Sequence, residues 1–263
     1  MKVIKSDLPE ELTHIELHIF ADEHMGDENC DMQRLKERIK YIEDTPNAFC
    51  VINGDIMDNA TKTSIGDTYT QTINPMEQIA NAVEIFSPIK HKILAISHGN
   101  HEARTYRKEG IDLSAIMAVR LDLIDKYTPT SALLFLRFGS TCRKESNGSG
   151  KYRKICYTLY MLHGSGGGRK EGAKAIRLAD MASIVDTDIY IHSHTHLGMI
   201  MKQGFYRIDP RNNTVAFVDK LFVNTASNLN YGGYGEAQEF KPSSKQTPVI
   251  YLNGRKKEMT ATL

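Results

Sequence analysis

The sequence predicts an α/β fold in which stacked β-sheets are flanked by helices. Strand and helix patterns alternate through the first half of the 263 residues, and the second half is rich in strands. Because 41% of the residues are hydrophobic and 25% are charged, the composition is that of a globular protein and argues against disorder. We expect one domain over residues 1–263.

Strands and helices follow one another in the first half of the chain. Period-two alternation and short apolar runs predict strands, whereas apolar residues spaced three and four apart predict helices. The strands are expected at 15–20, 48–53 and 92–97, and the helices from 31, from 75 and over 111–125. The helix start after Asn74 is the most specific signal, since a capping side chain precedes Pro75 at the first helical position and Glu77 at the third.

Strand patterns dominate the second half of the chain. They predict strands at 132–138, 155–162 and 188–192, with one helix near 170–182. Residues 146–150 read as a loop between strands. Asn253 and Gly254 stand between two strand-like segments, which predicts a two-residue hairpin turn.

Charge, hydropathy and cysteine spacing exclude several classes of protein. The formal net charge of +1 excludes an overall polycation. No segment approaches the roughly 20 apolar residues that span a bilayer, and the N-terminus has no apolar core of signal-peptide length, so we expect a cytoplasmic protein without a membrane partner. The cysteines form no C-x-x-C pair, and reduced thiols are expected at Cys30, Cys50, Cys142 and Cys156.

Five predicted strands end in side chains of the kind that bind metal ions. The segments are D-E-H at 22–24, G-D-I-M-D at 54–58, G-N-H-E at 99–102, L-H-G at 162–164 and H-S-H-T-H at 192–196. Open α/β sheets form ligand sites beyond the carboxyl ends of their strands, so these segments are expected to meet. Carboxylate, imidazole and amide ligands together suit divalent Mn, Fe or Zn.

In this order the five segments resemble the motifs of the calcineurin-like metallophosphoesterases: D-x-H, G-D-x-x-D, G-N-H-[DE], a lone H, and G-H-x-H. They run from Asp22 to His196. Ser193 departs from the family's glycine, and because serine is small we expect only a small change in the turn. The resemblance implies a four-layer α-β-β-α sandwich with two stacked mixed β-sheets flanked by helices. It also implies a hydrolase that cleaves a phosphate ester with metal-activated water.

The resemblance further implies a dinuclear centre with two divalent transition-metal ions, for which Mn²⁺ is favoured and Fe or Zn is compatible. Seven side chains would bind the ions. One ion would be held by Asp22, His24 and His196, the other by Asn100, His163 and His194, and both by Asp55. Two such cations can clamp a phosphate and lower the pKa of a shared water.

Three further residues are candidates for catalysis and substrate binding. By the resemblance, His101 would face the substrate together with Asn100 and protonate the leaving oxygen. Asp58 would orient His101 by accepting its ring proton. Arg104 follows His101 by three residues, and both phosphate binding and a surface salt bridge are open for it.

Two neighbouring features have more than one interpretation. His192 is two residues before His194, and we expect it to be packed rather than to bind metal. The glycine-rich run at 164–168 follows His163, and it is equally compatible with backbone contacts to phosphate and with a mobile loop that gives substrate access.

The distribution of charge bears on the substrate. Between Arg137 and Arg177 ten Lys and Arg residues face two Glu residues, a net charge of +8 that leaves −7 for the rest of the chain. A basic surface favours a polyanion, because contacts to phosphates release counterions. Bases could stack on tyrosines, for which the candidates are Tyr152, Tyr157, Tyr231 and Tyr234.

We therefore predict a nuclease-like phosphodiesterase that acts on nucleic acid. The alternatives are a phosphomonoesterase or cyclic-nucleotide phosphodiesterase acting on a small molecule, a phosphoprotein phosphatase, and a binding module that has lost catalysis. The complete set of ligand residues argues against the last alternative. A homo-oligomer is compatible with the sequence, which carries no signal for one.

Overall fold

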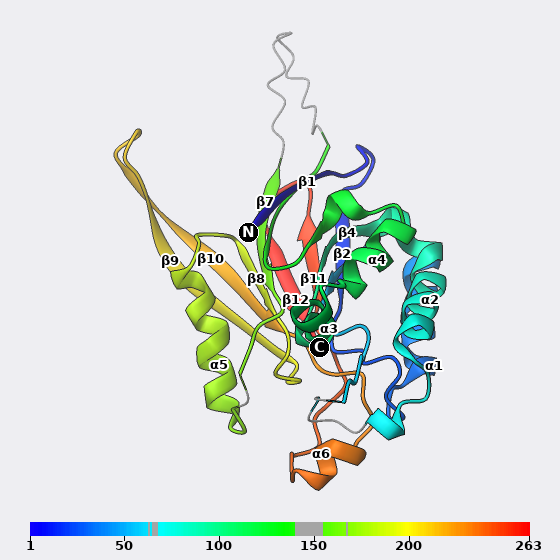
Figure 1. Cartoon of the computed structure of the whole chain (residues 1–263). Coiled ribbons are helices and arrows are strands. Elements are labelled where there is room, and N and C mark those ends of the chain that lie inside the picture. Colours follow the sequence, from blue (N-terminus) through cyan, green and yellow to red (C-terminus); the bar gives the residue numbers. More distant parts are fainter. Residues whose placement is uncertain (63, 65–67, 140–154, 167) are drawn as a thin grey trace.

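The computed structural model describes residues 1–62, 64, 68–139, 155–166 and 168–263. Two six-stranded sheets lie face to face (Figure 1). The first sheet runs in the order β1 (Lys2–Asp7), β6 (Ala132–Arg137), β7 (Cys156–Leu162), β8 (Ile189–His192), β10 (Thr214–Asn224) and β9 (Met199–Asp209). The second sheet runs in the order β12 (Met259–Thr262), β11 (Val249–Asn253), β2 (His14–Phe20), β3 (Ala48–Asn53), β4 (Ile93–Ser97) and β5 (Tyr127–Thr128).

Both sheets are mixed. In the second sheet β2, β3, β4 and β5 are parallel, whereas β11 pairs antiparallel with β2 and with β12. In the first sheet β7, β8 and β10 are parallel, and β6 and β9 pair antiparallel with β7 and β10. The carboxyl ends of β2, β3 and β4 therefore share one edge of their sheet, and those of β7, β8 and β10 share one edge of the other.

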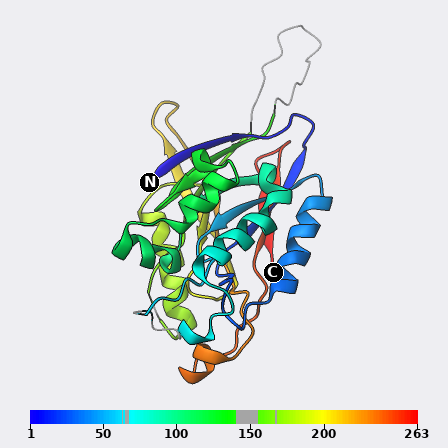
Figure 2. The ribbon, with the colours of Figure 1, turned by 45° about the vertical axis from the view of Figure 1, so that its right-hand side comes forward.

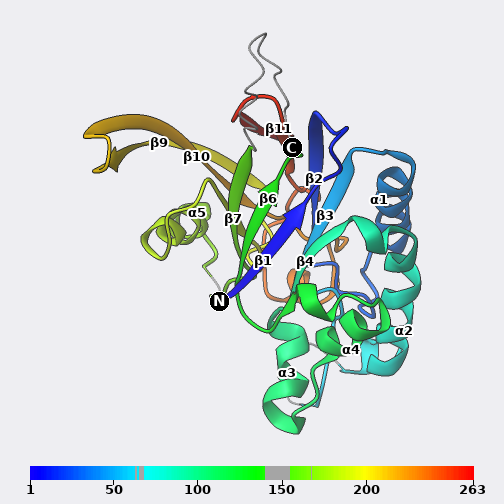
Figure 3. The ribbon, with the colours of Figure 1, turned by 90° about the horizontal axis from the view of Figure 1, so that it is seen from above.

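Helices cover the outer faces of the two sheets. Over the second sheet lie α1 (Met32–Asp44), α2 (Pro75–Phe86) and α4 (Leu113–Arg120), whereas α5 (Glu171–Asp180) covers the first sheet (Figures 1 and 3). Figure 2 shows the same layers from another side. Two further helices are α3 (Asn100–Glu109), which follows β4, and the short α6 (Gly233–Ala237). The predicted four-layer α-β-β-α sandwich with two mixed sheets is thereby confirmed.

The core explains why the strand patterns differ. Between the sheets, alternate residues such as Leu17, Leu134 and Val223 form one apolar layer. All six residues of β3 are buried, because β3 lies between the core and the helices and so has no solvent-facing side. For that reason its sequence is a continuous apolar run rather than an alternation.

Most predicted elements occur at the expected places, and the structure also explains the differences. The capping box at Asn74 starts α2, with Asn74 Oδ1 accepting from the N–H groups of Met76 and Glu77. The helix expected over 111–125 ends at Arg120, because Asp122 takes a left-handed conformation with φ of 63°. Pattern reasoning did not find β1 or α3, and it expected hairpin-like segments in the C-terminal third of the chain without giving the bounds of β9 and β10.

The predicted two-residue turn at Asn253 is wrong. Leu252 pairs with Met259, so the connection between β11 and β12 is longer than two residues. Its backbone is anchored by the buried hydroxyl of Tyr157, which lies 2.7 Å from the carbonyl oxygen of Asn253 and accepts from the N–H of Glu258 at 2.8 Å. A tertiary contact, rather than local turn chemistry, sets this loop.

Two smaller expectations can be compared with the described residues. Cys30, Cys50 and Cys156 are free thiols, whereas Cys142 lies outside the described part of the chain. Within that part, no helix combines the length and the apolar character needed to cross a membrane.

We predict that Tyr157→Phe lowers the free energy of unfolding by about 1–3 kcal/mol. The substitution removes the buried hydroxyl and its hydrogen bonds to the partly buried backbone of the loop, each of which contributes about 0.5–1.5 kcal/mol. Urea unfolding monitored by circular dichroism measures the change.

The matched control is Tyr106→Phe, which removes a hydroxyl from an exposed tyrosine. It should change the free energy of unfolding by less than about 0.5 kcal/mol. Equal effects of the two variants would contradict the anchoring role of Tyr157.

Candidate metal centre

The predicted ligands follow the strand ends in strained backbone conformations. Asp22, His24, Asp55, His194 and His196 all have positive φ angles, between 51° and 66°. They are five of the nine such non-glycine residues in the described part of the chain. Each costs about 1–3 kcal/mol and persists only where its surroundings impose it, which is typical of functional sites.

The buried carboxylate of Glu102 holds the Gly54–Met57 turn in place. One of its oxygens accepts from the N–H groups of Asp55 and Gly99, at 3.0 and 2.9 Å. The other accepts from the N–H groups of Ile56 and Met57, at 2.8 and 3.1 Å. Glu102 therefore ties the end of β3 to the start of α3, which carries Asn100 and His101.

Two glycines make this close approach possible. A Cβ atom on Gly54 would lie 2.4 Å from the backbone nitrogen of Gly99, and one on Gly99 would lie 2.0 Å from Oδ1 of Asp55. Neither position has room for a side chain. Close packing of the backbone therefore explains why the G-D and G-N motifs begin with glycine.

The first predicted ligand group lies together. The ligand atoms of Asp22, His24 and His196 are all within 4.8 Å of one another. Nε2 of His196 is 3.3 Å from Nε2 of His24 and 3.4 Å from Oδ1 of Asp22. Asp22 and His24 are buried, while the side chain of His196 is partly open to solvent.

The second group also lies together and includes the predicted bridging carboxylate. Ligand atoms of Asp55, His163 and His194 are within 4.8 Å of one another. Nε2 of His163 is 3.1 Å from Oδ2 of Asp55 and 3.1 Å from Oδ1 of Asn100. Asp55 thus stands beside the ligands that were expected to share its metal.

Hydrogen bonds aim the histidine rings into the site. His163 donates from Nδ1 to the carbonyl oxygen of Asn53 at 2.7 Å, and Nδ1 of His24 lies 3.2 Å from Oδ1 of Asp58. In each ring Nε2 is therefore the atom that faces the other ligands. Outer partners of this kind fix the tautomer and orientation of metal-binding histidines.

Asp58, His24 and His101 form a third group of titratable side chains within 4.8 Å. Nδ1 of His101 is 2.7 Å from the carbonyl oxygen of Asp58 and 3.0 Å from its Oδ1. The carboxylate of Asp58 also accepts from Gln71 Nε2 at 2.7 Å. The contacts suit an acceptor that orients His101, the role predicted for Asp58, and nothing in the sequence indicated its second contact, with His24.

Arg104 contacts His101 directly. Its Nη2 lies 2.9 Å from His101 Nε2, and its Nη1 donates to the carbonyl oxygen of Asp58 at 3.2 Å. Because a guanidinium group can only donate, His101 Nε2 is the acceptor. Among the described residues no carboxylate forms an ion pair with Arg104, so the structure does not bear out the surface salt bridge.

Burial and neighbouring charges raise the pKa values of two ligand histidines and lower that of a third. Burial opposes protonation of His163, yet the charge of Asp55 raises the pKa of His163 to about 10. In His24 the hydrogen bond to Asp58 and the charge of Asp55 likewise overcome burial and raise the pKa to about 9. Burial, aided by the charge of His163, lowers the pKa of His194 to about 4.

The residues present fit metal ions. Oδ1 of Asp55 accepts the N–H of His101 at 2.9 Å, but its Oδ2 is buried and accepts no hydrogen bond from any described residue. This oxygen faces Nε2 of His163, which in turn lies 3.1 Å from the amide oxygen of Asn100, and carboxylate, imidazole and amide groups together suit divalent Mn, Fe or Zn. The charge of this oxygen is offset by Nε2 of His163, 3.1 Å away, only while that ring carries its second proton, and a cation beside both groups would replace that proton.

Residues outside the motifs support the site. The side-chain nitrogen of Asn53 donates to the carbonyl oxygen of Leu162 and to Ser193 Oγ, so it joins the two sheets at this edge. Lys174 on α5 donates to the carbonyl oxygen of Thr195 at 2.7 Å, between two predicted ligands. The sequence reasoning missed both residues. For Asn53 a signal existed, since it directly precedes the G-D motif at a strand end.

His192 and the glycine-rich run are packed together. His192 is buried, with Nδ1 2.8 Å from Oδ1 of Asn224. A Cβ atom on Gly164 would lie 2.3 Å from Nε2 of His192, and one on Gly166 would lie 2.5 Å from the guanidinium carbon of Arg177. Both glycines have positive φ angles, of 103° and 97°, which favour glycine, and at Gly164 the buried ring of His192 also leaves no room for a side chain. Neither of the two interpretations of the run included this local role.

Only part of the basic stretch can be placed. Arg143, Lys144, Lys151, Arg153 and Lys154 lie outside the described residues. Arg137 pairs with Cys156 at the amino end of β7, whereas His163 follows the carboxyl end of that strand. Arg137 and Cys156, which lie on either side of the residues that cannot be placed, are therefore at the opposite end of β7 from the candidate metal centre.

The tyrosines proposed for base stacking differ in accessibility. Tyr157 is buried in the core, so it is not available for stacking. Tyr231 is exposed. Tyr152 and the side chain of Tyr234 lie outside the described part of the structure.

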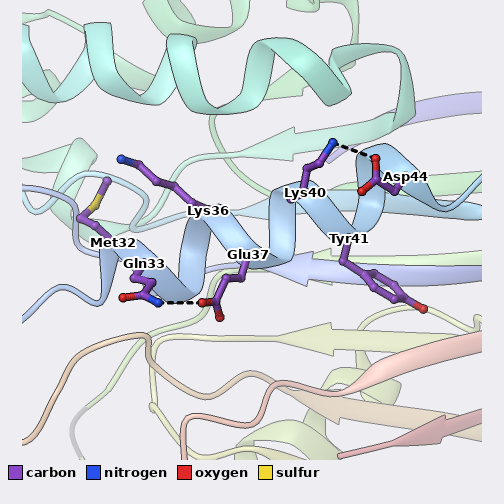
Figure 4. Close-up of a pocket in the computed structure, with 7 residues that line it drawn as sticks. All are labelled: Met32, Gln33, Lys36, Glu37, Lys40, Tyr41 and Asp44. Carbon is purple, nitrogen blue, oxygen red and sulfur yellow. Dashed lines mark hydrogen bonds and ion pairs between the residues drawn. The ribbon is translucent and has the colours of Figure 1, made fainter.

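A shallow hollow elsewhere on the surface lacks the kind of clustered ligand residues that form the candidate metal centre. It is lined by the outer face of α1, where Gln33 donates to Glu37 and Lys40 pairs with Asp44 (Figure 4). These are ordinary contacts of a solvent-facing helix, and none of the predicted ligands lines the hollow.

Comparisons with known proteins give only distant likenesses. No protein-family model matches the chain, and no curated protein matches it either. Among solved structures it is similar to a conserved uncharacterised protein of Streptococcus pneumoniae TIGR4, described as a predicted phosphoesterase, with 11% identity and a TM-score of 0.35 over 92% of this chain and 83% of that one. It is also similar to a Pseudomonas putida nuclease, with 13% identity and a TM-score of 0.35 over 94% and 87%.

TM-scores of 0.35 are too low to support an inference about the function of this chain. Its resemblance to the calcineurin-like metallophosphoesterases stands on the five ordered motifs and on the convergence of their side chains at one edge of the two sheets.

We predict that Mn²⁺ raises the melting temperature by about 5–10 °C at a hundredfold excess over its dissociation constant. The increase should grow with pH, because protons on His163 and His24, with pKa values of about 10 and 9, compete with the ion. Without metal the sign is opposite. Stability from the raised imidazole pKa values is full below about 6.5 and is lost as the pH rises toward 9–10. Differential scanning fluorimetry at several pH values measures both trends.

Asp55→Asn should reduce the Mn²⁺-dependent increase, since it neutralises the carboxylate expected to contact both ions. Asp219→Asn, on an exposed part of β10, is the matched control and should leave the increase unchanged. An increase of equal size in all three proteins would show that Mn²⁺ binds elsewhere.

Proposed function

We propose that this protein is a metal-dependent phosphoesterase with a dinuclear centre. The ligands of one ion are Asp22, His24 and His196, those of the other are Asn100, His163 and His194, and Asp55 is shared. The observation that carries the proposal is the buried Oδ2 of Asp55, which accepts no hydrogen bond and lies 3.1 Å from Nε2 of His163. Two bound cations would supply a water of lowered pKa and offset charge on the phosphate oxygens.

The protein's own groups hold and orient the reacting phosphate. Asn100 and His101 stand at the start of α3, beside Asp55, where the amide and the imidazole can reach a phosphate at the ions. Asp58 accepts the proton on Nδ1 of His101 and so keeps Nε2 toward the site. To protonate the leaving oxygen, His101 would have to carry a second proton on Nε2, with Arg104 turned from that nitrogen to the substrate.

Arg104 supplies a fixed positive charge beside His101. Its guanidinium group lies 2.9 Å from His101 Nε2 and has no described carboxylate partner. A guanidinium group binds phosphate oxygens through two parallel donors, so Arg104 is suited to hold a non-bridging oxygen of the substrate. We assign phosphate binding to Arg104.

For the substrate we favour a phosphodiester of nucleic acid, cleaved in a nuclease-like reaction with Mn²⁺ as the metal. Three basic residues support a polyanion: Arg104 contacts His101, Lys174 contacts Thr195, and Arg177 packs against Gly166. A small phosphomonoester, a cyclic nucleotide and a phosphoprotein are the competing substrates.

We predict that the metal-loaded protein cleaves bis-p-nitrophenyl phosphate faster than p-nitrophenyl phosphate, and that it cleaves labelled DNA or RNA. Asp55→Asn should lower kcat/KM by about 100-fold or more, because the shared ligand loses its charge. Steady-state kinetics in Mn²⁺ measure the change.

Asp219→Asn is the control for this experiment and should retain full turnover. Faster cleavage of the monoester would replace the diesterase assignment with a phosphomonoesterase. Undiminished turnover by Asp55→Asn would refute the proposed centre.

We predict that Arg104→Met lowers kcat/KM for the diester by about 100-fold, since it removes a donor aimed at developing negative charge. Arg107→Met, on the same helix but exposed, is the matched control and should have little effect. The same Mn²⁺-dependent melting shift in both variants would show that Arg104 acts on the substrate and not on the metals. A fall in turnover equal for both variants would argue against a specific role.

A further inference from the structure

The β9–β10 hairpin has an apolar face that is exposed in the described part of the structure. Its two strands pair over eleven residues each, and they project beyond the sandwich (Figures 1 and 3). Tyr206 is 78% exposed, Ile208 71%, Val215 62% and Phe217 63%. We call these four residues the hairpin patch.

The patch forms one continuous surface. Tyr206 pairs with Phe217 and Ile208 pairs with Val215 in the antiparallel register, so all four side chains lie on the same face of the two strands. The rings of Tyr206 and Phe217 meet edge to face with centroids 5.6 Å apart. A Cβ atom on Gly204 would lie 2.1 Å from the Phe217 ring, so this ring rests directly on the backbone of β9.

The hairpin patch continues the inner face of the first sheet. Going toward the body of the molecule, the same face carries Leu221 and Val223, which are buried between the two sheets with Met259 of β12. Because β12 is the edge of the second sheet, none of the described strands lies over the outer half of the hairpin. The patch is thus a core-type surface that lacks its covering layer.

The opposite face of the hairpin is different. There Phe205 packs against the cluster under α5, and the ammonium group of Lys220 lies 4.5 Å from the centre of its ring. The hairpin therefore has one side attached to the body and one side free, which is the form of an interaction surface rather than of a loosely held loop.

Charge around the patch favours a neutral, apolar partner. On this face the neighbouring charges are Lys202 and Asp219, which neutralise each other at a distance of 3.3 Å. A polyanion or a charged peptide would find no unpaired charge of opposite sign among these neighbours. A second copy of this chain presents the same apolar surface, and the formal net charge of +1 gives little repulsion between copies.

The size of the patch also fits self-association. Two aromatic and two branched side chains offer about 400–500 Å² of mostly apolar surface, the size of the main apolar patch of a soluble protein, which often serves binding. A stable interface buries about 800 Å² on each partner, so this patch with its polar rim supplies the centre of one. We propose that two copies form a two-fold symmetric dimer in which the hairpin patches pack against each other.

Sedimentation velocity over a wide range of protein concentration tests the proposal. The wild-type chain should change from monomer to dimer, and the double variant Tyr206→Thr/Phe217→Thr should weaken association by about 30-fold or more, as loss of central aromatic anchors does. The control is Val3→Thr, on the exposed edge strand β1, which should associate like the wild type.

A fluorescence measurement gives an independent readout. The chain contains no Trp, so Trp in the variant Phe217→Trp is a unique reporter, and its emission should shift to shorter wavelength as the dimer forms. A wild-type protein that stays monomeric at high micromolar concentration would overturn the proposal. A dimer that persists undiminished in the folded double variant would overturn it as well. Neither outcome affects the proposed phosphoesterase activity, which is measured separately.

Discussion

The candidate metal centre depends on the buried carboxylate of Glu102, which accepts four backbone N–H groups from two chain segments. Without it these donors would be buried and unpaired, since no strand or helix partner satisfies them. The same contacts bring Asp55 next to α3, where the N–H of His101 occupies Oδ1 of Asp55 and leaves Oδ2 free. Gly54 and Gly99 permit this approach because neither position has room for a Cβ atom. One side chain therefore orients the carboxylate that both ions are proposed to share.

Charge balance is the second constraint on this region. Asp22, Asp55 and Asp58 are buried within reach of one another, and each has its pKa held below the usual value by neighbouring imidazoles that overcome burial. Without a cation, protons on His24 and His163 supply the compensating charge. Metal ions would replace those protons without moving the carboxylates. Protons and metals can therefore exchange in one preformed site, whose strained backbone is held by the hydrogen bonds around it.

The sequence predicted the parts of this arrangement that follow from local chemistry. Short apolar runs ending in Asp, Asn or His identified the strand ends, and the order of the motifs grouped the ligands that the fold brings together. Contacts made across the chain could not be read in this way. Tyr157 sets the loop after Asn253 although it lies in a distant strand, and Lys174 reaches Thr195 from a helix in the other layer. The length of β9 and β10 was missed as well, because their outer halves project beyond the sandwich and their extent is set by strand pairing rather than by burial in the core.

At two places in the molecule the residues are not those that the local backbone conformation or solvent exposure would favour, and the causes differ. At the metal centre, positive φ angles at Asp22, Asp55 and His194 raise the energy of the backbone, and folding alone would favour asparagine or glycine there. Asparagine lacks the charge that a cation needs. At the hairpin, Tyr206 and Phe217 stabilise the pairing of the two strands through their edge-to-face contact, yet they leave apolar surface in water. The strain at the metal centre and the exposed apolar surface at the hairpin both carry a cost in the isolated chain. Binding offsets that cost: ions in the first case, and the proposed second copy of the chain in the other.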